Sequence, residues 1–314
     1  MNRCLITYQD IPGNQIYSST GLKKLSPRLH TLQLFPYSSL QQRQEAVSRA
    51  TKISIQGVQP KLSARLNIAK GTFELVDTHG LYILKPTSLD YEELPANEDL
   101  TMKLASYVGI EVPFHGLIHC VDNSLTYFIR RFDRAPHHRK LAVEDFAQLA
   151  GLTRDTKYNA SMELVVRILE TYTTFPVVEK LKLFERVIFC FLIGNEDMHL
   201  KNFSLITRNN KVELSPAYDL VNTTAILTNP LEEIALPLRG KKNKLTHDDI
   251  FDYFALQRLA LPSRLIEKTL KRFRNIQKEW EQLISISFLS SIMKERYQSI
   301  LNARCRRLWT TEPD

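Results

Sequence analysis

Residues 194–206 read GNEDMHLKNFSLI, and residues 215–220, one strand-like piece later, read SPAYDL. The first of these segments directly follows Val187–Ile193, the longest uninterrupted apolar run in the chain. A buried segment therefore leads into a loop that is rich in polar side chains. The side chains with chemical potential in the two segments are Asp197, His199, Lys201, Asn202 and Asp219.

Phosphoryl transfer from ATP requires side chains of these kinds. One carboxylate orients the attacking hydroxyl and accepts its proton, an amide oxygen and a second carboxylate hold Mg²⁺, and a cation or imidazole steadies the phosphates. Asp197 and Asn202 have the Asp-x-x-x-x-Asn spacing of a protein-kinase catalytic loop, and Asp219 lies where a metal-binding Asp is expected. This order favours phosphoryl transfer over a capped turn with solvated charges.

The first part of the chain carries strand signals. Short alternating stretches between residues 54 and 84 predict two or three antiparallel strands, which end at Lys85-Pro86. Residues 97–107 have apolar side chains at helical spacing, and residues 115–132 look like a hairpin. Lys85 follows the apolar strand LYIL and Glu98 lies on the next helix, so the two are placed to pair.

The later part of the chain has a helical texture. Helices are expected at residues 40–50, 141–151, 161–172, 177–194 and, for the most part, 264–309. Two short strands flank Asn209-Asn210, and Thr246 with Asp249 resembles a helix N-cap. The outline is a two-lobed α+β chain with a β-rich lobe at residues 1–132 and a mostly helical lobe at residues 133–314.

The composition limits the possible classes of protein. The 314 residues include 42 Lys and Arg against 34 Asp and Glu, a net charge of +8 that favours an anionic partner. No apolar run approaches the roughly 20 residues that span a bilayer, so no membrane association is expected. The four cysteines are far apart, which argues against a zinc site or a disulfide framework. Since no Sec-type signal is visible, a cytoplasmic location is expected.

One further loop is compatible with phosphate binding. SIQGVQPKLS, residues 54–63, contains a single glycine, Gly57, and precedes a predicted strand. Its backbone N–H groups are able to lie over phosphates. With one glycine it is not a P-loop, and on its own this signal is weak.

The set of motifs resembles a known family. SIQGVQPKL, YILKP, PANEDLTMKLA, YFIRRFDR, EDFAQLAG, GNEDMHLKNFS and SPAYDL occur in this order between residues 54 and 220. Together they resemble the HipA-like Ser/Thr protein kinases, toxins of bacterial toxin–antitoxin systems. Only residues 1–53 precede the SIQG motif, fewer than the additional N-terminal subdomain of HipA itself would need. The sequence is therefore similar to the short HipT type, in which a separate small protein, HipS, supplies that part.

The resemblance implies a bilobal protein-kinase-like fold and a role for each motif residue. It implies that Asp197 is the catalytic base and that Mg²⁺ binds Asn202 and Asp219. ATP would be held by the remaining residues. These are Lys85 with its partner Glu98, His199 at the phosphates, Arg130 to Phe132 as the adenine hinge, and Gly57 in the SIQG loop.

The resemblance also implies regulation and partners. Ser54 matches the autophosphorylated serine of the SIQG loop, but Lys52 stands where short relatives often carry a second serine. The expected partners are a HipS-like small antitoxin and a HipB-like DNA-binding antitoxin, through which alone the chain would meet DNA. The expected target is a protein substrate, and the family points to an aminoacyl-tRNA synthetase.

Two other functions are compatible with the residues. A small-molecule kinase of the aminoglycoside-phosphotransferase type has the same Asp-x-x-x-x-Asn spacing. A nucleotide- or DNA-associated module without catalysis would account for the basic charge alone.

Overall fold

The computed structural model of the chain describes residues 2–49, 59–135, 139–152 and 158–309. The chain divides into two compact units that are not continuous in sequence. Unit 1 comprises residues 1–100, 113–139 and 286–289, and unit 2 comprises residues 101–112, 140–285 and 290–314. Among the described helices, none has the length and apolar character needed to cross a bilayer.

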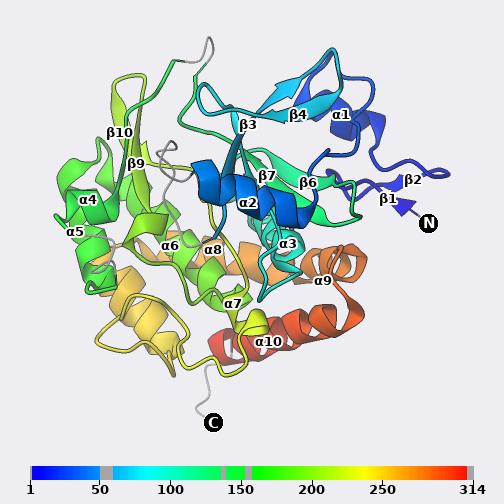
Figure 1. The fold of residues 1–314 in the computed structure, drawn as a ribbon. Coiled ribbons are helices and arrows are strands. Elements are labelled where there is room, and N and C mark those ends of the chain that lie inside the picture. The colour runs from blue at the N-terminus through cyan, green and yellow to red at the C-terminus, as the bar shows by residue number, and fades with distance from the viewer. Residues whose placement is uncertain (1, 50–58, 136–138, 153–157, 310–314) are drawn as a thin grey trace. The chain divides into compact units, whose positions relative to one another are not determined.

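Unit 1 is built on a five-stranded antiparallel sheet with the strand order β4-β3-β5-β7-β6 (Figure 1). Its strands are β3 (Leu62–Asn67), β4 (Thr72–Leu75), β5 (Tyr82–Lys85), β6 (His115–His119) and β7 (Leu125–Arg130). The other elements are β1 (Asn2–Arg3), β2 (Asp10–Ile11), α1 (Ser19–Leu25), α2 (Ser39–Arg49) and the first half of α3 (Leu94–Tyr107). The predicted strands, hairpin and helices of this unit are confirmed, whereas β1, β2 and α1 were not predicted.

Helices α2 and α3 contact opposite faces of this sheet. Successive side chains of a strand point to opposite faces. On β7, the Thr126 hydroxyl donates to Gln42 of α2 over 2.9 Å. The next residue, Tyr127, is the register partner of Lys85, whose Nζ lies 2.5 Å from Oε1 of Glu98 on α3. The lysine and the first half of α3 therefore share one face of the sheet.

Unit 2 combines a small sheet with most of the helices (Figure 1). The antiparallel sheet has the order β10-β9-β8, with β8 (Val143–Asp145), β9 (Ser204–Arg208) and β10 (Lys211–Leu214). The helices are α4 (Phe146–Leu149), α5 (Met162–Tyr172), α6 (Pro176–Ile193), α7 (Thr223–Ile226), α8 (Ser263–Asn275), α9 (Gln277–Ile286) and α10 (Ser291–Trp309). A 3₁₀ turn, η2 (Leu200–Asn202), and a π-helix, η3 (Asp249–Arg258), complete it.

Helix α6 forms the centre of unit 2. Its last seven residues, Val187–Ile193, are all buried, and the helix packs against α5 and α10. The all-round apolar character of this stretch explains why it lies inside the unit and not on its surface. The helix that the sequence predicts at residues 177–194 is thereby confirmed.

The helix expected at residues 141–151 is wrong for the first half of that range. Val143 and Asp145 instead pair with Ile206 and Ser204 of β9, so their backbone groups are satisfied by a strand distant in sequence. A short helix begins only after Asp145, whose carboxylate accepts the N–H of Gln148 over 2.9 Å as an N-cap.

Two local signals of unit 2 are confirmed by geometry. Asn209 and Asn210 connect β9 to β10 with φ angles of 49° and 59°, the left-handed conformation that tight hairpin turns require. Thr246 and Asp249 form reciprocal bonds, in which Thr246 N–H donates to Asp249 over 3.1 Å and Asp249 N–H to Thr246 over 3.3 Å. The helix that follows them is a π-helix, a difference from the regular helix expected.

Candidate active site

Gly194 turns the chain out of α6 and into the GNEDMHLKN loop. It adopts φ 73°, a left-handed conformation that costs glycine little. A Cβ at this position would meet Ile300 Cγ2 and Thr224 Oγ1 at 2.9 Å. The Gly194 carbonyl also accepts the Thr224 hydroxyl over 2.9 Å, which ties the start of the loop to α7. Close packing therefore fixes where the loop begins.

The loop gathers three predicted residues, Asp197, His199 and Asn202. Asn202 is buried, and its amide Nδ2 donates to the Asp197 carbonyl over 2.8 Å. His199 is also buried, with Nε2 3.9 Å from Oδ1 of Asp197. The side chain of Asp197 itself is 52% exposed, so its carboxylate is accessible to solvent while its main chain is held by Asn202. A carboxylate held in this way is suited to accept a proton from an incoming hydroxyl.

Asp219 lies beside the same loop through its neighbour in sequence. The Tyr218 hydroxyl donates to the Lys201 carbonyl over 2.9 Å and shares a hydrogen bond with Ser204. Tyr218 is the neighbour of Asp219, and Lys201 is the neighbour of Asn202. This hydrogen bond therefore links the segment that carries Asp219 to the loop that carries Asn202. The φ of 56° at Asp219 is uncommon outside glycine, and strained backbone of this kind occurs preferentially at functional sites.

Lys85 and Glu98 form a buried ion pair in unit 1. Lys85 is 3% exposed and Glu98 0% exposed, and the ring of Tyr127 lies 5.6 Å from Lys85 Nζ. The lysine closes strand β5 and the glutamate lies in the first half of α3, the arrangement that the sequence predicts. Such a pair places a cation at a defined position without leaving its charge uncompensated.

A second pair beside it was missed by sequence reasoning. Asp99 follows Glu98 on α3, and its Oδ1 lies 2.8 Å from Nδ1 of His115 on β6. Both residues are buried, and the His115 ring lies 5.9 Å from that of Tyr127. Adjacent acids on α3 thus contact strands on either side of β7. A single His with no motif around it gave no signal for this contact.

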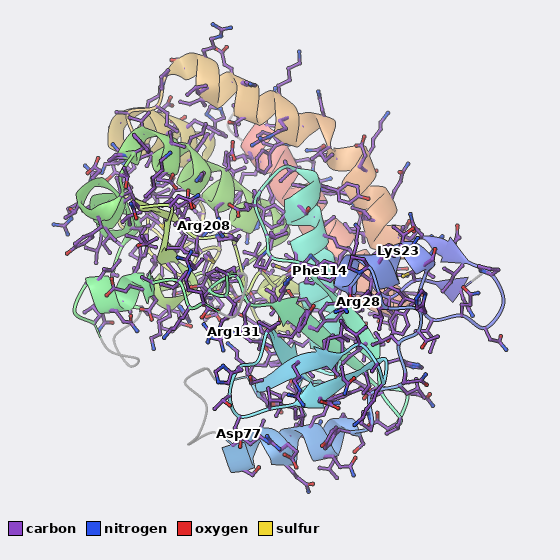
Figure 2. The ribbon with its side chains drawn as sticks, turned by 90° about the horizontal axis from the view of Figure 1, so that it is seen from above. Lys23, Arg28, Asp77, Phe114, Arg131 and Arg208 are labelled. Carbon is purple, nitrogen blue, oxygen red and sulfur yellow. The ribbon has the colours of Figure 1, made fainter. Side chains whose placement is uncertain are left out.

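The expected hinge, residues 130–132, closes strand β7. The N–H of Arg130 donates to the Phe114 carbonyl and that of Arg131 to the Leu81 carbonyl, both over 2.8 Å. The guanidinium of Arg131, labelled in Figure 2, donates to both carboxylate oxygens of Asp133 over 2.8 and 2.9 Å. The N–H groups of Arg130 and Arg131 are therefore used within unit 1 and are not donors to an adenine at this segment.

Tyr158 is a second contact that the sequence did not reveal. Its hydroxyl donates to Oδ1 of Asp197, and its ring packs edge-on against His199 with centroids 5.0 Å apart. Burial, and then the Asp197 carboxylate, raise the pKa of Tyr158 well above its usual value. The phenol therefore stays protonated and remains a donor at neutral pH.

The remaining predicted positions, Ser54 and Gly57, lie outside the described residues, as does Lys52. Five of the predicted residues that the structure describes form two groups, while Arg130 and Phe132 lie at the end of β7 and Asp219 follows β10. Asp197, His199 and Asn202 come together in unit 2, and Lys85 and Glu98 come together in unit 1.

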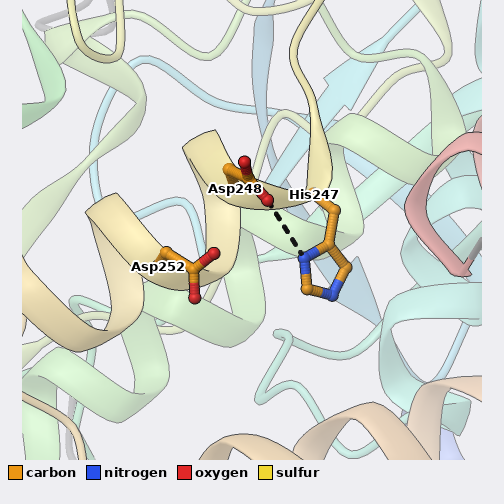
Figure 3. A group of neighbouring side chains, drawn as sticks. All are labelled: His247, Asp248 and Asp252. Atoms are coloured by element: carbon orange, nitrogen blue, oxygen red, sulfur yellow. Dashed lines mark ion pairs between the residues drawn. The ribbon is translucent and has the colours of Figure 1, made fainter. Parts of the chain in front are cut away.

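Another group of possible metal ligands lies at the start of η3 (Figure 3). His247, Asp248 and Asp252 offer ligand atoms within 4.8 Å of one another, and His247 Nδ1 lies 3.8 Å from Asp248 Oδ1. Both aspartates are exposed, and the His247 ring packs on Phe251 at 4.4 Å. Exposed acidic groups commonly occur without a metal, so this group supports no assignment.

Comparison with known proteins agrees with the geometry. The sequence profile of the HipA-like C-terminal domain matches residues 53–280. A protein of Haemophilus influenzae named "Putative kinase" is 31% identical over 267 residues, which cover 77% of this chain and 75% of that protein. The serine/threonine-protein kinase toxin HipA of Shewanella oneidensis is 29% identical over 195 residues, covering 54% of this chain but only 43% of that protein.

The fold is that of a solved structure as well. HipA of Shewanella oneidensis, solved with HipB and its operator DNA, superposes with a TM-score of 0.69 at 23% identity, covering 89% of this chain and 72% of that one. The α+β, kinase-like fold expected from the sequence is thereby confirmed. With the profile match over most of its length and the order of its loop residues, the chain belongs to the family of proteins with a HipA-like C-terminal domain.

Proposed function

We propose that this chain is an ATP- and Mg²⁺-dependent protein Ser/Thr kinase and the toxin of a HipBST-like toxin–antitoxin system. The observation that carries the proposal is the loop in which Asn202 braces the main chain of Asp197 while the Asp197 carboxylate stays exposed. The kinase names of the relatives support the same reaction class.

In this proposal Asp197 is the general base. The acceptor hydroxyl donates to its carboxylate, attacks the γ-phosphorus of ATP and passes its proton to Asp197, while the bond from the γ-phosphorus to the bridging oxygen breaks and ADP leaves. His199 contacts the phosphates from inside the loop. Its burial and edge-on contact with Tyr158 hold the imidazole in one orientation.

The donor set fits a magnesium ion. Asn202 uses its nitrogen on the Asp197 carbonyl, so its amide oxygen is the atom available to a cation, and Asp219 adds a carboxylate. Oxygen ligands of these two kinds are the ones that Mg²⁺ prefers. When bound, the ion would neutralise charge that develops on the phosphates.

The nucleotide contacts of unit 1 complete the proposal. Lys85, oriented by Glu98, binds the α- and β-phosphates, and residues 130–132 with the Phe132 ring hold the adenine. The proposal also assigns Gly57 of the SIQG motif to phosphate binding. The buried 2.5 Å contact between Lys85 and Glu98 supports the first of these roles.

The proposal includes self-inhibition at Ser54. Phosphorylation adds a charge of about −1.5 to −2, which would eject the SIQG loop from an already anionic nucleotide site. A HipS-like protein and a HipB-like antitoxin neutralise the toxin, and DNA is contacted only through the latter. The association of Shewanella HipA with HipB and operator DNA supports these partners. The protein target in the cytoplasm is an aminoacyl-tRNA synthetase.

The test compares the full chain with Asp197→Asn, using radiolabelled ATP, Mg²⁺ and a cell extract as the source of acceptors. We expect label on protein serine or threonine from the unchanged chain and a loss of at least 100-fold in Asp197→Asn, since general-base catalysis contributes about 10²–10⁴. Asp248→Asn, an exposed aspartate, is the matched control and should keep full activity. Label on small molecules alone would support a small-molecule kinase, and ATP binding without transfer would support a non-catalytic module.

A further inference from the structure

Tyr158 occupies a position on Asp197 that the proposed reaction needs. Its hydroxyl donates to Oδ1 of the carboxylate, and the contact of its ring with His199 holds the side chain from a second direction. The Tyr158 residue is 39% exposed and the Asp197 side chain 52% exposed, so solvent reaches both. The contact therefore lies where a molecule arriving from solution would meet the base.

The hydrogen bond from Tyr158 to Asp197 is of the same kind as the one that an acceptor hydroxyl would make. A hydroxyl that is about to be phosphorylated must lie within about 2.6–3.2 Å of the base and donate its proton to it. The Tyr158 phenol already donates to Oδ1 in the chain alone. Asp197 is otherwise held through its main chain, by Asn195 on its N–H over 3.0 Å and Asn202 on its carbonyl over 2.8 Å. These bonds fix the backbone. At the carboxylate, Tyr158 donates to Oδ1, and His199 Nε2 lies 3.9 Å from the same oxygen.

We propose that Tyr158 is a positioning residue that occupies the proton-accepting oxygen of Asp197 until an acceptor hydroxyl displaces it. The inference rests on the proposed kinase function. It assigns to Tyr158 the regulation of access of the acceptor hydroxyl to Asp197. Transfer then requires the phenol to leave Oδ1 first. After that the acceptor oxygen bonds to the γ-phosphorus, the acceptor proton goes to Asp197, and ADP departs.

The consequence is competition between two hydroxyl groups for one oxygen. Removing the phenol hydroxyl should favour acceptor binding without altering the chemical step, because the base and its backbone supports are unchanged. Hydrogen bonds to charged groups are stronger than neutral ones. We therefore expect about a tenfold fall in the acceptor KM with kcat changed less than twofold.

The test uses Tyr158→Phe, which removes only the hydroxyl and keeps the ring against His199. Tyr172→Phe, a change of the same kind at an exposed tyrosine of α5, is the matched control. Two acceptors are measured with Mg-ATP, namely water, followed as ADP release, and myelin basic protein, followed as bound radiolabel. We expect Tyr158→Phe to speed ADP release about tenfold and to lower the KM for the protein, and Tyr172→Phe to match the unchanged chain.

Several results would overturn the inference. An unchanged KM, or a fall in kcat at constant KM, would show that the phenol does not compete with the acceptor. Phosphotyrosine at position 158 in the unchanged chain would show the phenol to be an acceptor itself. If the unchanged chain and Asp197→Asn release ADP equally slowly, the proposed kinase function fails and the inference fails with it. If Asp197→Asn loses ADP release while Tyr158→Phe behaves like the unchanged chain, the inference fails and the proposed kinase function stands.

Discussion

The buried Lys85–Glu98 pair allows stability and activity to be separated. Glu98→Leu replaces by an apolar side chain the carboxylate that lies 2.5 Å from the Lys85 ammonium, which is 3% exposed. Lys85→Met together with Glu98→Leu removes both charges and fills the space with apolar groups. Glu98→Leu should be less stable than the double variant. Both variants should lose phosphate transfer.

The magnitude follows from the geometry. At 2.5 Å and an effective dielectric constant of about 20, the gross attraction between the two charges is about 7 kcal/mol. Desolvation of two buried ions offsets most of this, so the net contribution of the pair is small. Removing the Glu98 carboxylate leaves the desolvation cost of the Lys85 ammonium in place. We therefore expect Glu98→Leu to lower the local free energy of opening by about 3–5 kcal/mol. The double variant should stay within about 1 kcal/mol of the unchanged chain.

The assay must report on unit 1. Both tryptophans, Trp280 and Trp309, lie in unit 2, so fluorescence would follow the wrong unit. Hydrogen exchange of peptides that cover β5 and β7 gives the local free energy of opening beside the pair. Phosphate transfer from Mg-ATP is measured on the same samples. Lys271→Met, at an exposed lysine of α8, is the control and should change neither quantity.

Two results would refute this reasoning. Equal loss of protection in the single and double variants would mean that the Lys85 charge, with the Glu98 carboxylate removed, is not the cause of the instability. Substantial phosphate transfer by the double variant would mean that Lys85 does not bind the nucleotide phosphates.

Two further predictions concern unit 2, where Trp280 fluorescence follows urea unfolding. Gly194→Ala should lower the free energy of unfolding by about 2–4 kcal/mol, because it places an alanine in the left-handed conformation and in close contact with Ile300 and Thr224. Gly151 also has a left-handed φ, 68°, but open space around it. Gly151→Ala should therefore lower the free energy of unfolding by only about 1 kcal/mol. Equal losses would contradict this account of the turn. Burial alone would raise the pKa of Asp249, but hydrogen bonds from Lys241 and Thr246 outweigh it and hold that pKa below 3.8. This stabilisation is present above pH 3.8 and is lost as pH falls through the lower folded value, so Asp249→Asn should flatten the acid limb of the stability profile. An unchanged acid limb in that variant would count against it.

The sequence was most informative where structure is set by near neighbours. The turn at Asn209-Asn210, the buried helix before Gly194 and the loop spacing from Asp197 to Asn202 all follow from local chemistry, and the structure contains each of them. The pairing of Lys85 with Glu98 was predictable because a strand and the next helix are adjacent in the chain.

The sequence was least informative where contacts join distant segments. Strand β8 forms because Val143 pairs with Ile206 on β9, and no pattern within residues 141–151 predicts that partner. The same holds for the bond from Tyr158 to Asp197 and for the contact of Asp99 with His115. Each of these depends on the packed fold, which periodicity and spacing do not encode.

The most direct test of the account is a crystal structure of the full chain with Mg²⁺ and a non-hydrolysable ATP analogue. We expect the ion about 2.0–2.1 Å from the Asn202 amide oxygen and an Asp219 carboxylate oxygen. We also expect Lys85 Nζ within hydrogen-bond distance of the α- or β-phosphate. A nucleotide bound away from Lys85, or a magnesium ion held without Asn202 and Asp219, would contradict the central claim.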